Sequence, residues 1–307
     1  MVGAHDTSHI VSSLVANLII AVGKGVAAAL TKSGTLLAEA IHSLADCGNQ
    51  ALLLFGVKRA LRPPDAAHPL GYGRALYFWS FMVALLLFTG GGVFSLYEGL
   101  HKIRHPEPIA RAWIGFVVLG GALLIEGWAT LGNLRELERR RGQTPLFRYL
   151  RSTKDSDLVV VFGENSAAVL GLVLAMAALA LSVVTGDARW DGVGSLAIGV
   201  VLVGVAVFLA IEVKALLIGE SADPEFVRVV HEVVAEDARF ESVLQLVTVQ
   251  QGPGEVVVAM KVKFASGLAV DEVCAAINEF ERRLRARAPE ARWVFVEPDL
   301  APAVAAA

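Results

Sequence analysis

Six long apolar stretches limit the folds open to this chain more than any other feature. A helix of roughly 20 residues spans a bilayer, because each residue adds about 1.5 Å along the helix axis. Hydrophobic residues make up 55% of the chain and charged residues only 19%, whereas a soluble domain has about 45–50% and about 25%. The sequence therefore predicts an α-helical membrane protein with six transmembrane helices, at 10–30, 35–58, 76–100, 112–134, 157–185 and 190–216.

The composition changes after residue 216, where charged and apolar residues begin to alternate. The patterns that follow predict a small α+β domain in the order αββαβ. Its elements are expected from Asp223-Pro224 to about 237, at 243–250, 255–264 and about 270–287, and at 292–298. We thus predict a transmembrane domain at 1–216, a cytoplasmic domain at 217–298 and a disordered tail at 299–307.

Basic residues are divided unevenly between the two sets of loops. Eleven lie in the loops after spans 2 and 4, and five lie in the loops on the opposite side. The positive-inside rule then places both termini and the small domain in the cytoplasm. The first ten residues, MVGAHDTSHI, have no basic region or cleavage site typical of a signal peptide, so we expect the first span to be retained. We predict a multi-pass protein of a bacterial-type inner or plasma membrane.

The second apolar stretch contains an unusual polar stripe within the segment LAEAIHSLADCGNQALLLF at 37–55. On a helical wheel, Glu39, His42, Asp46 and Asn49 all fall within an arc of about 90°. His42 and Asp46 lie one turn apart, so both side chains can reach one point. An imidazole and a carboxylate that converge suit a divalent metal such as zinc. The alternative interpretation is a structural stripe that holds helices together through hydrogen bonds.

Other ionisable residues also lie within the predicted spans, where a charge is costly unless it is paired or bound. Lys24 and Glu98 lie within reach of span ends, where they can snorkel or pair. Glu126 can act as a buried hydrogen-bonding partner or as a proton carrier. The segment VVVFGENSAAVLG in the fifth span offers Glu164 and Asn165 to complete a metal site with span 2. Counted from the predicted span ends, however, Glu164 and His42 differ in depth by roughly 20 Å.

Two segments make the chain resemble the cation diffusion facilitators, which are proton-coupled transporters of divalent metals. These segments are AEAIHSLADCGNQALLL in span 2 and RPPDAAHPLGYGRALYFWS after it. The resemblance covers roughly residues 10 to 298. It implies a metal site in the middle of the membrane between spans 2 and 5, alternating access, a C-terminal domain that resembles a metallochaperone, and a homodimer joined partly through that domain.

The resemblance also implies which residues bind metal. Span 2 keeps the family's His-x-x-x-Asp pattern as His42 and Asp46, whereas span 5 has Glu164 followed by Ala168 at the second position. This departure is similar to the branch that includes the animal mitochondrial zinc transporter. We expect His42, Asp46 and Glu164 as strong ligands, with Asn165, Glu39 or water completing the site.

The loop after span 2 holds a weaker candidate site. In some members of the family this loop binds a second metal, and Asp65 and His68 are the matching residues here, while the position of an additional histidine is Tyr72. Two ligands make a weak, exposed site, so a purely structural turn is the alternative.

The polar stripe and the resemblance together predict a secondary transporter that exports a divalent cation, with Zn²⁺ as the expected ion, from the cytoplasm by proton antiport. The predicted partners are the metal ion, protons, the lipid bilayer and a second copy of the chain. We expect no cofactor besides the transported metal, no nucleic acid and no enzymatic activity. The alternative is a non-transporting metal-sensing or partner subunit, because the site lacks one standard ligand.

Overall fold

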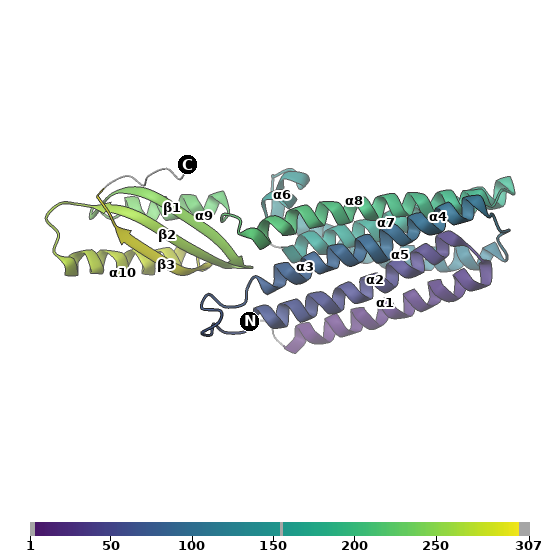
Figure 1. Cartoon of the computed structure of the whole chain (residues 1–307), viewed down its shortest axis with the longest axis horizontal. Helices are drawn as coiled ribbons and strands as arrows, with labels where there is room; N and C mark the ends of the chain where they lie inside the picture. The colour runs from purple at the N-terminus through teal and green to yellow at the C-terminus, as the bar shows by residue number, and fades with distance from the viewer. Residues whose placement is uncertain (1–3, 154–155, 301–307) are drawn as a thin grey trace. The chain divides into compact units, whose positions relative to one another are not determined.

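The structure is a computed structural model that describes residues 4–153 and 156–300 (Figure 1). Its contacts divide the chain into two compact units. The first contains most of the helical part, and the second contains Lys58–Tyr77 and the chain from Lys214 onward. The predicted domain boundary at residue 216 lies two residues after Lys214, where the chain enters the second unit for the last time. The predicted tail at 299–307 falls mostly outside the described residues.

The first unit is built from long helices. α5 packs against both α1 and α7. A short helix, α6, precedes α7. The bounds are α1 Ala4–Thr31, α2 Gly34–Ala60, α3 Ala75–Leu86, the π-helical segment η1 Leu87–Val93, α4 Phe94–Arg104, α5 Ala112–Arg141, α6 Leu146–Ser152, α7 Ser156–Thr185 and α8 Arg189–Ile218.

Four helical segments of the described chain are long and apolar enough to cross a membrane: Ala75–Arg104, Ala112–Arg141, Leu158–Thr185 and Arg189–Ile218. Asn17–Thr31 forms a shorter apolar segment. α2 also has the length of a span, but its polar residues lower its hydropathy, which is why it falls outside this group. The chain is therefore a helical, membrane-type protein, and the predicted count of six spans goes beyond these four.

Close helix packing in this unit depends on glycine. A Cβ atom added to Gly99 of α4 would lie 2.7 Å from the carbonyl oxygen of Gly192 in α8, and one added to Gly192 would lie 2.8 Å from that of Gly99. Both distances are too short for carbon and oxygen atoms in contact. The two helices therefore approach each other at a point that only glycine permits.

The first turn of α2 is fixed by Asp191, a residue of α8. Its buried carboxylate accepts hydrogen bonds from the backbone N–H groups of Gly34 and Thr35, at 2.5 and 3.2 Å. It also accepts from the hydroxyls of Ser33 and Thr35, both at 2.5 Å. A carboxylate at a helix N-terminus satisfies N–H groups that lack partners within the helix and complements the helix dipole. Asp191 thus anchors the helix that carries the polar stripe.

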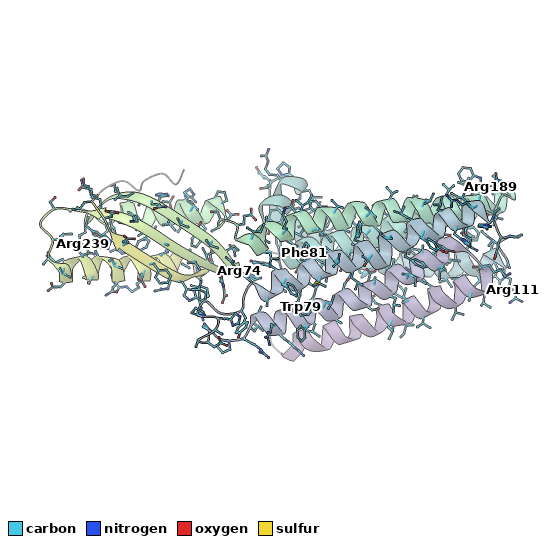
Figure 2. The ribbon with its side chains drawn as sticks, viewed as in Figure 1. Arg74, Trp79, Phe81, Arg111, Arg189 and Arg239 are labelled. Carbon is cyan, nitrogen blue, oxygen red and sulfur yellow. The ribbon has the colours of Figure 1, made fainter. Side chains whose placement is uncertain are left out.

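The two ends of the helical unit carry different residues. Arg111 and Arg189, which belong to the less basic set of loops, lie at the same end of the unit, whereas Trp79 and Phe81 lie toward the other (Figure 2). This placement agrees with a bundle in which these two arginines share one side of a membrane.

The C-terminal part of the second unit contains a three-stranded sheet with two helices. Its elements are α9 Pro224–Ala235, β1 Phe240–Gly252, β2 Glu255–Phe264, α10 Val270–Arg287 and β3 Ala291–Pro298. The strand order is β1-β2-β3, with β1 antiparallel and β3 parallel to β2. Asp223 accepts a hydrogen bond from the backbone N–H of Glu225, and Pro224 follows it, so α9 begins with the cap that the sequence predicts.

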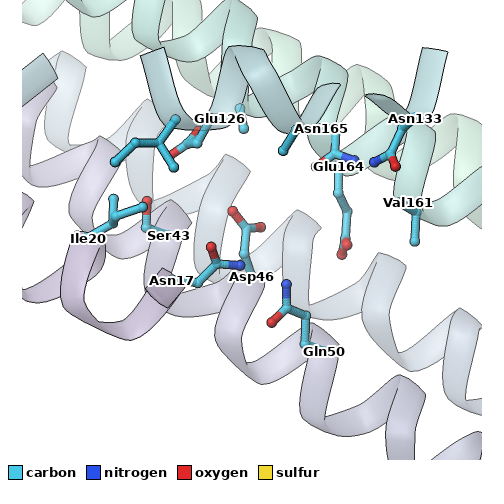
Figure 3. Close-up of a pocket in the computed structure, with 13 residues that line it drawn as sticks. Asn17, Ile20, Ser43, Asp46, Gln50, Glu126, Asn133, Val161, Glu164 and Asn165 are labelled. Carbon is cyan, nitrogen blue, oxygen red and sulfur yellow. The ribbon is translucent and has the colours of Figure 1, made fainter. Parts of the chain in front are cut away.

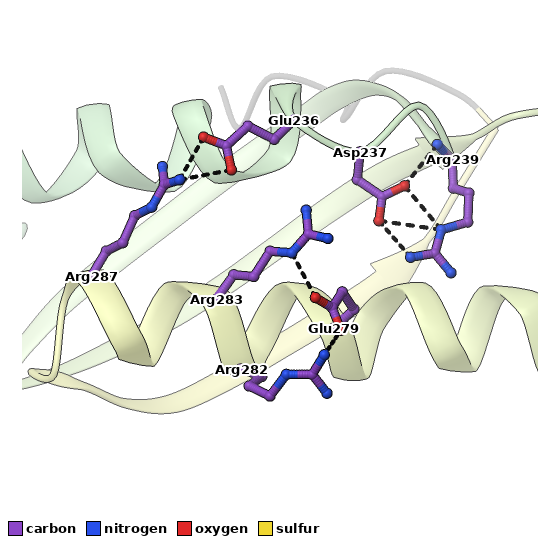
Figure 4. A network of polar contacts seen from close by, with 7 residues as sticks. All are labelled: Glu236, Asp237, Arg239, Glu279, Arg282, Arg283 and Arg287. Atoms are coloured by element: carbon purple, nitrogen blue, oxygen red, sulfur yellow. Dashed lines mark hydrogen bonds and ion pairs between the residues drawn. The ribbon is translucent and has the colours of Figure 1, made fainter.

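One face of this sheet forms the core of the small domain. Buried residues alternate along β2 with a period of two, at Val256, Val258, Met260 and Val262. Phe280 of α10 and Phe226 of α9 belong to the same buried cluster. The helices are also joined at their ends, because Arg287 forms an ion pair with Glu236 at 2.7 Å (Figure 4). The domain is therefore held by a common apolar core with polar contacts around its rim.

The loop after α2 packs against the β1–β2 hairpin. A Cβ atom on Gly73 would lie 2.7 Å from the carbonyl oxygen of Gln251 and 3.0 Å from the Cα atom of Gly252. This contact explains why Lys58–Tyr77 belongs to the second unit. The sequence alone predicts this segment as part of the transmembrane domain at 1–216.

Candidate metal site

A polar cavity of about 300 Å³ lies within the helical unit. Residues from α1, α2, α5 and α7 line it (Figure 3). Three carboxylates contribute to its wall: Asp46 from α2, Glu126 from α5 and Glu164 from α7. Asp46 and Glu164 point into the space between α2 and α7 (Figure 3). A cavity with three acids inside apolar helices is suited to receive a cation.

His42 lies beside Asp46, one turn away on α2. Its Nδ1 atom is 3.6 Å from Oδ1 of Asp46, too far for a hydrogen bond. The imidazole is fully buried, and both of its ring nitrogens lack a hydrogen-bond partner. Because buried polar atoms are normally paired, these two nitrogens are available to a ligand. His42 is not among the side chains that line the cavity, whereas its neighbour Asp46 is.

Glu164 is held toward α2 by Asn49. The Asn49 side-chain amide donates a hydrogen bond of 2.5 Å to Oε1 of Glu164. Asn165, the next residue of α7, lines the same cavity, as does Ala168. The predicted partnership between spans 2 and 5 therefore has a direct physical link in this structure, through Asn49 rather than His42.

Glu39 takes part in a different interaction. Its Oε2 atom accepts a hydrogen bond of 3.0 Å from the ammonium group of Lys24, and Glu39 does not line the cavity. Lys24 is fully buried, so of the two possibilities raised by the sequence it pairs and does not snorkel. The role of Glu39 as a metal ligand remains a prediction, and in the structure its carboxylate forms an ion pair with Lys24.

The loop candidates Asp65 and His68 are exposed and close together. The Nδ1 atom of His68 is 3.5 Å from Asp65 Oδ1, and the Tyr72 hydroxyl donates a hydrogen bond of 2.7 Å to Asp65 Oδ2. This hydroxyl, followed by the backbone N–H of His68, holds the pKa of Asp65 below its usual value. The Asp65 carboxylate thus already accepts hydrogen bonds that stabilise the turn, in agreement with the structural interpretation of this loop.

The structure brings the predicted ligands together in pairs. His42 meets Asp46, and Asp46 shares a cavity with Glu164 and Asn165. Within residues 4–153 and 156–300, however, no group of three or more His, Cys, Asp or Glu side chains is arranged so that it could hold a metal ion. The convergence of His42, Asp46 and Glu164 on one ion therefore stays a prediction.

Three side-chain amides that line the cavity were not predicted from the sequence: Asn17, Gln50 and Asn133. Their spacing carries a signal. Gln50 follows Asp46 by one helical turn, while Asn17 precedes Lys24, and Asn133 follows Glu126, by two turns each. Residues separated by one or two turns share a helix face. A search for repeated polar residues at these intervals would have found all three.

Comparison with known proteins places the chain in a family. Residues 10–218 match the model of the cation efflux transmembrane domain. The proton-coupled zinc antiporter SLC30A9, mitochondrial, of Xenopus laevis is 33% identical over 237 residues, which cover 76% of this chain and 42% of that protein. Its counterpart in Homo sapiens is 31% identical over 257 residues, covering 83% and 45%. Metal tolerance protein C4 of Arabidopsis thaliana is 32% identical over 226 residues, covering 73% and 50%.

The chain thus spans half or less of the length of these three relatives. The matched family and the named antiporters are transporters, which is consistent with the prediction that the chain is not an enzyme. The chain therefore belongs to the cation efflux family of membrane metal transporters, and it resembles the animal mitochondrial zinc transporter.

Proposed function

We propose that the chain is a secondary transporter that exports Zn²⁺ from the cytoplasm in exchange for protons. The observation that carries this proposal is the pair of carboxylates, Asp46 and Glu164, on the wall of one cavity among apolar helices. The names of the SLC30A9 relatives, which describe proton-coupled zinc antiporters, support the choice of ion and of exchange mode.

The charge on this pair explains how exchange can work. An ionised carboxylate inside a membrane costs free energy unless a proton or a cation neutralises its charge. Two carboxylates are neutralised either by two protons or by one divalent cation. Because metal ligands must be deprotonated, binding of the metal displaces protons, and an excess of protons on the other side displaces the metal. The same two residues thus carry either cargo.

The choice of zinc depends on His42. Zinc accepts imidazole nitrogen readily, whereas Mg²⁺ and Mn²⁺ favour oxygen ligands. The unpaired ring nitrogens of His42 lie next to Asp46 and would have to turn toward the cavity to reach the ion. We propose His42, Asp46 and Glu164 as the main ligands, with Asn165 or water in addition.

The topology that we propose has six spans. α1 and α2 add two to the four apolar segments, because α2 has the required length and its polar face is buried. Both termini lie on the side with more basic loops, in the cytoplasm. The bacterial-type inner or plasma membrane remains a prediction, and the SLC30A9 relatives are described as mitochondrial.

We further propose that the chain forms a homodimer through the C-terminal domain. The sheet face opposite the helices exposes Val247 of β1 and Phe295 of β3, which are 43% and 56% exposed. Exposed apolar side chains on a sheet face are suited to contact a second copy. Light scattering of the full chain in detergent should give the mass of a dimer for the wild type and of a monomer for Val247→Glu/Phe295→Glu.

The proposed function is tested in proteoliposomes with a pH-sensitive dye. Zinc added to the wild-type protein should drive proton movement across the membrane. Asp46→Asn keeps the size of the side chain but removes its charge, so we expect it to abolish the response, while the exposed Asp187→Asn should retain it. Full proton movement by a well-folded Asp46→Asn protein would contradict the proposal. A wild type that binds zinc without moving protons would favour the non-transporting subunit instead.

A further inference from the structure

Lys24 is buried in the helical unit with all of its donors satisfied. It has no exposed surface, and its Nζ atom donates hydrogen bonds to Glu39 Oε2 at 3.0 Å, Ser43 Oγ at 2.8 Å and Glu126 Oε1 at 3.0 Å. An ammonium group has three N–H donors, so none is left for another partner. Two of these bonds are ion pairs with carboxylates.

This group connects three helices next to the metal cavity. Lys24 lies on α1, Glu39 and Ser43 lie on α2, and Glu126 lies on α5. Ser43 and Glu126 line the cavity, whereas Lys24 and Glu39 do not. One of the two carboxylates that Lys24 binds is therefore within reach of an ion in the cavity, and the other is not.

In both Glu39 and Glu126, one carboxylate oxygen accepts a hydrogen bond from Lys24 and the other has no hydrogen-bond partner. Oε1 of Glu39 and Oε2 of Glu126 are both buried and unpaired. The structure provides a dedicated space for Glu39, since a Cβ atom on Gly171 of α7 would overlap with its Oε1 atom. An unpaired carboxylate oxygen beside a cation cavity is a potential metal ligand, but the positive charge of an ammonium group on the other oxygen repels a second cation and weakens this binding.

We propose that Lys24 determines metal specificity by acting as a fixed internal cation. It holds Glu126 as a lysine-bound carboxylate and so keeps this third acid out of the coordination sphere of the transported ion. The ion is then left with Asp46, Glu164 and an imidazole, a mixed set of ligands that favours zinc. Without the ammonium group, Glu126 would add oxygen and negative charge to the site, which favours Mn²⁺. This inference rests on the proposed function, because both concern the same cavity.

Two double variants separate a specificity role from a structural one. Lys24→Met/Glu39→Gln leaves Glu126 without its cation, and Lys24→Met/Glu126→Gln leaves Glu39 without it. Both variants have the same net charge as the wild type, and both remove the lysine. They differ in whether the remaining carboxylate faces the cavity, so a merely structural role of Lys24 would affect both alike.

The measurement is equilibrium binding of Mn²⁺ and Zn²⁺ to the full chain in detergent, after size-exclusion chromatography shows a monodisperse peak. For Lys24→Met/Glu39→Gln we expect Mn²⁺ to bind about tenfold more tightly relative to Zn²⁺, since one added charged ligand changes metal affinity on this scale. For Lys24→Met/Glu126→Gln we expect the wild-type ratio. Equal ratios in the two variants, raised or unchanged, would overturn the proposal.

A second measurement applies if a double variant does not fold. Glu126→Gln keeps Lys24 and its bonds to Glu39 and Ser43, so the affinity for Zn²⁺ should change by less than about threefold. A loss of tenfold or more would show that Glu126 is itself a zinc ligand and would overturn the proposal. A wild-type protein that binds neither metal would instead contradict the proposed function.

Discussion

Replacing Asp191 by alanine should destabilise the protein strongly, because this one carboxylate anchors the start of α2. It accepts four hydrogen bonds from Ser33, Gly34 and Thr35. The two hydroxyls lie 2.9 Å apart and can still bond to each other after the substitution. The backbone N–H groups of Gly34 and Thr35 lose their acceptor, and each buried N–H without a partner costs about 1–3 kcal/mol.

The loss of a negative charge at the helix N-terminus adds up to about 1 kcal/mol. The total for Asp191→Ala is therefore about 2–7 kcal/mol, with a middle value of about 4 kcal/mol. Asp191→Asn keeps one acceptor oxygen and should cost about half as much. Asp187 provides a matched control, because it also caps a backbone N–H, that of Arg189 at 2.9 Å, but is exposed. Asp187→Ala should cost less than about 1 kcal/mol.

Thermal unfolding of the purified protein in detergent measures these differences. For a chain of this size, the middle value of about 4 kcal/mol corresponds to a decrease in the melting temperature of about 10 °C. Asp191→Asn should fall between Asp191→Ala and the wild type, and Asp187→Ala should melt near the wild type. If Asp191→Ala and Asp187→Ala melt at the same temperature, the anchoring role of Asp191 is wrong.

Three further predictions concern single residues. Gly171→Ala should destabilise the protein by about 1–3 kcal/mol because its Cβ overlaps with a buried carboxylate, whereas Gly204→Ala, which has open space, should not; thermal unfolding compares the two. His42→Asp should raise uptake of Mn²⁺ relative to Zn²⁺ in proteoliposomes, and an unchanged ratio would exclude His42 from selectivity. Tyr72→Phe should weaken the loop at neutral pH, where Asp65 is ionised, because the Tyr72 hydroxyl is the main cause of the lowered pKa of Asp65. A carboxylate with a lowered pKa stabilises the folded loop at higher pH, and this stabilisation is lost as the pH falls through the lowered pKa. Hydrogen exchange should therefore show the loop opening at a higher pH in the variant than in the wild type, and identical pH profiles would contradict this.

Periodicity and composition placed several long helices of the membrane part, but not the short helix α6 or the π-helical segment η1. The second predicted span at 35–58 corresponds to α2 at Gly34–Ala60, and the last one at 190–216 to α8 at Arg189–Ile218. The strand expected at 255–264 has those bounds in the structure. Long apolar runs and alternating strands leave a clear pattern in one sequence, because their period follows from local geometry.

The pairing of side chains between helices could not be predicted in the same way. Glu39 and Asp46 share one stripe of α2, yet Glu39 binds Lys24 and Asp46 lines the cavity. The partner of each side chain depends on which neighbouring helix it faces. The packing of the helices against one another determines this, and the sequence of one helix does not show it. Glu164 likewise bonds to Asn49, which lies two turns or about 10 Å beyond His42 along α2.

The central claim is that the transported ion binds between α2 and α7, and the position of bound zinc tests it most directly. Crystals of the protein grown with Zn²⁺ and measured at the zinc absorption edge would locate the ion by anomalous scattering. We predict a peak about 2.0–2.2 Å from carboxylate oxygens of both Asp46 and Glu164. A peak only at Asp65 and His68, or one between Glu39 and Glu126, with none at Asp46, would contradict the claim.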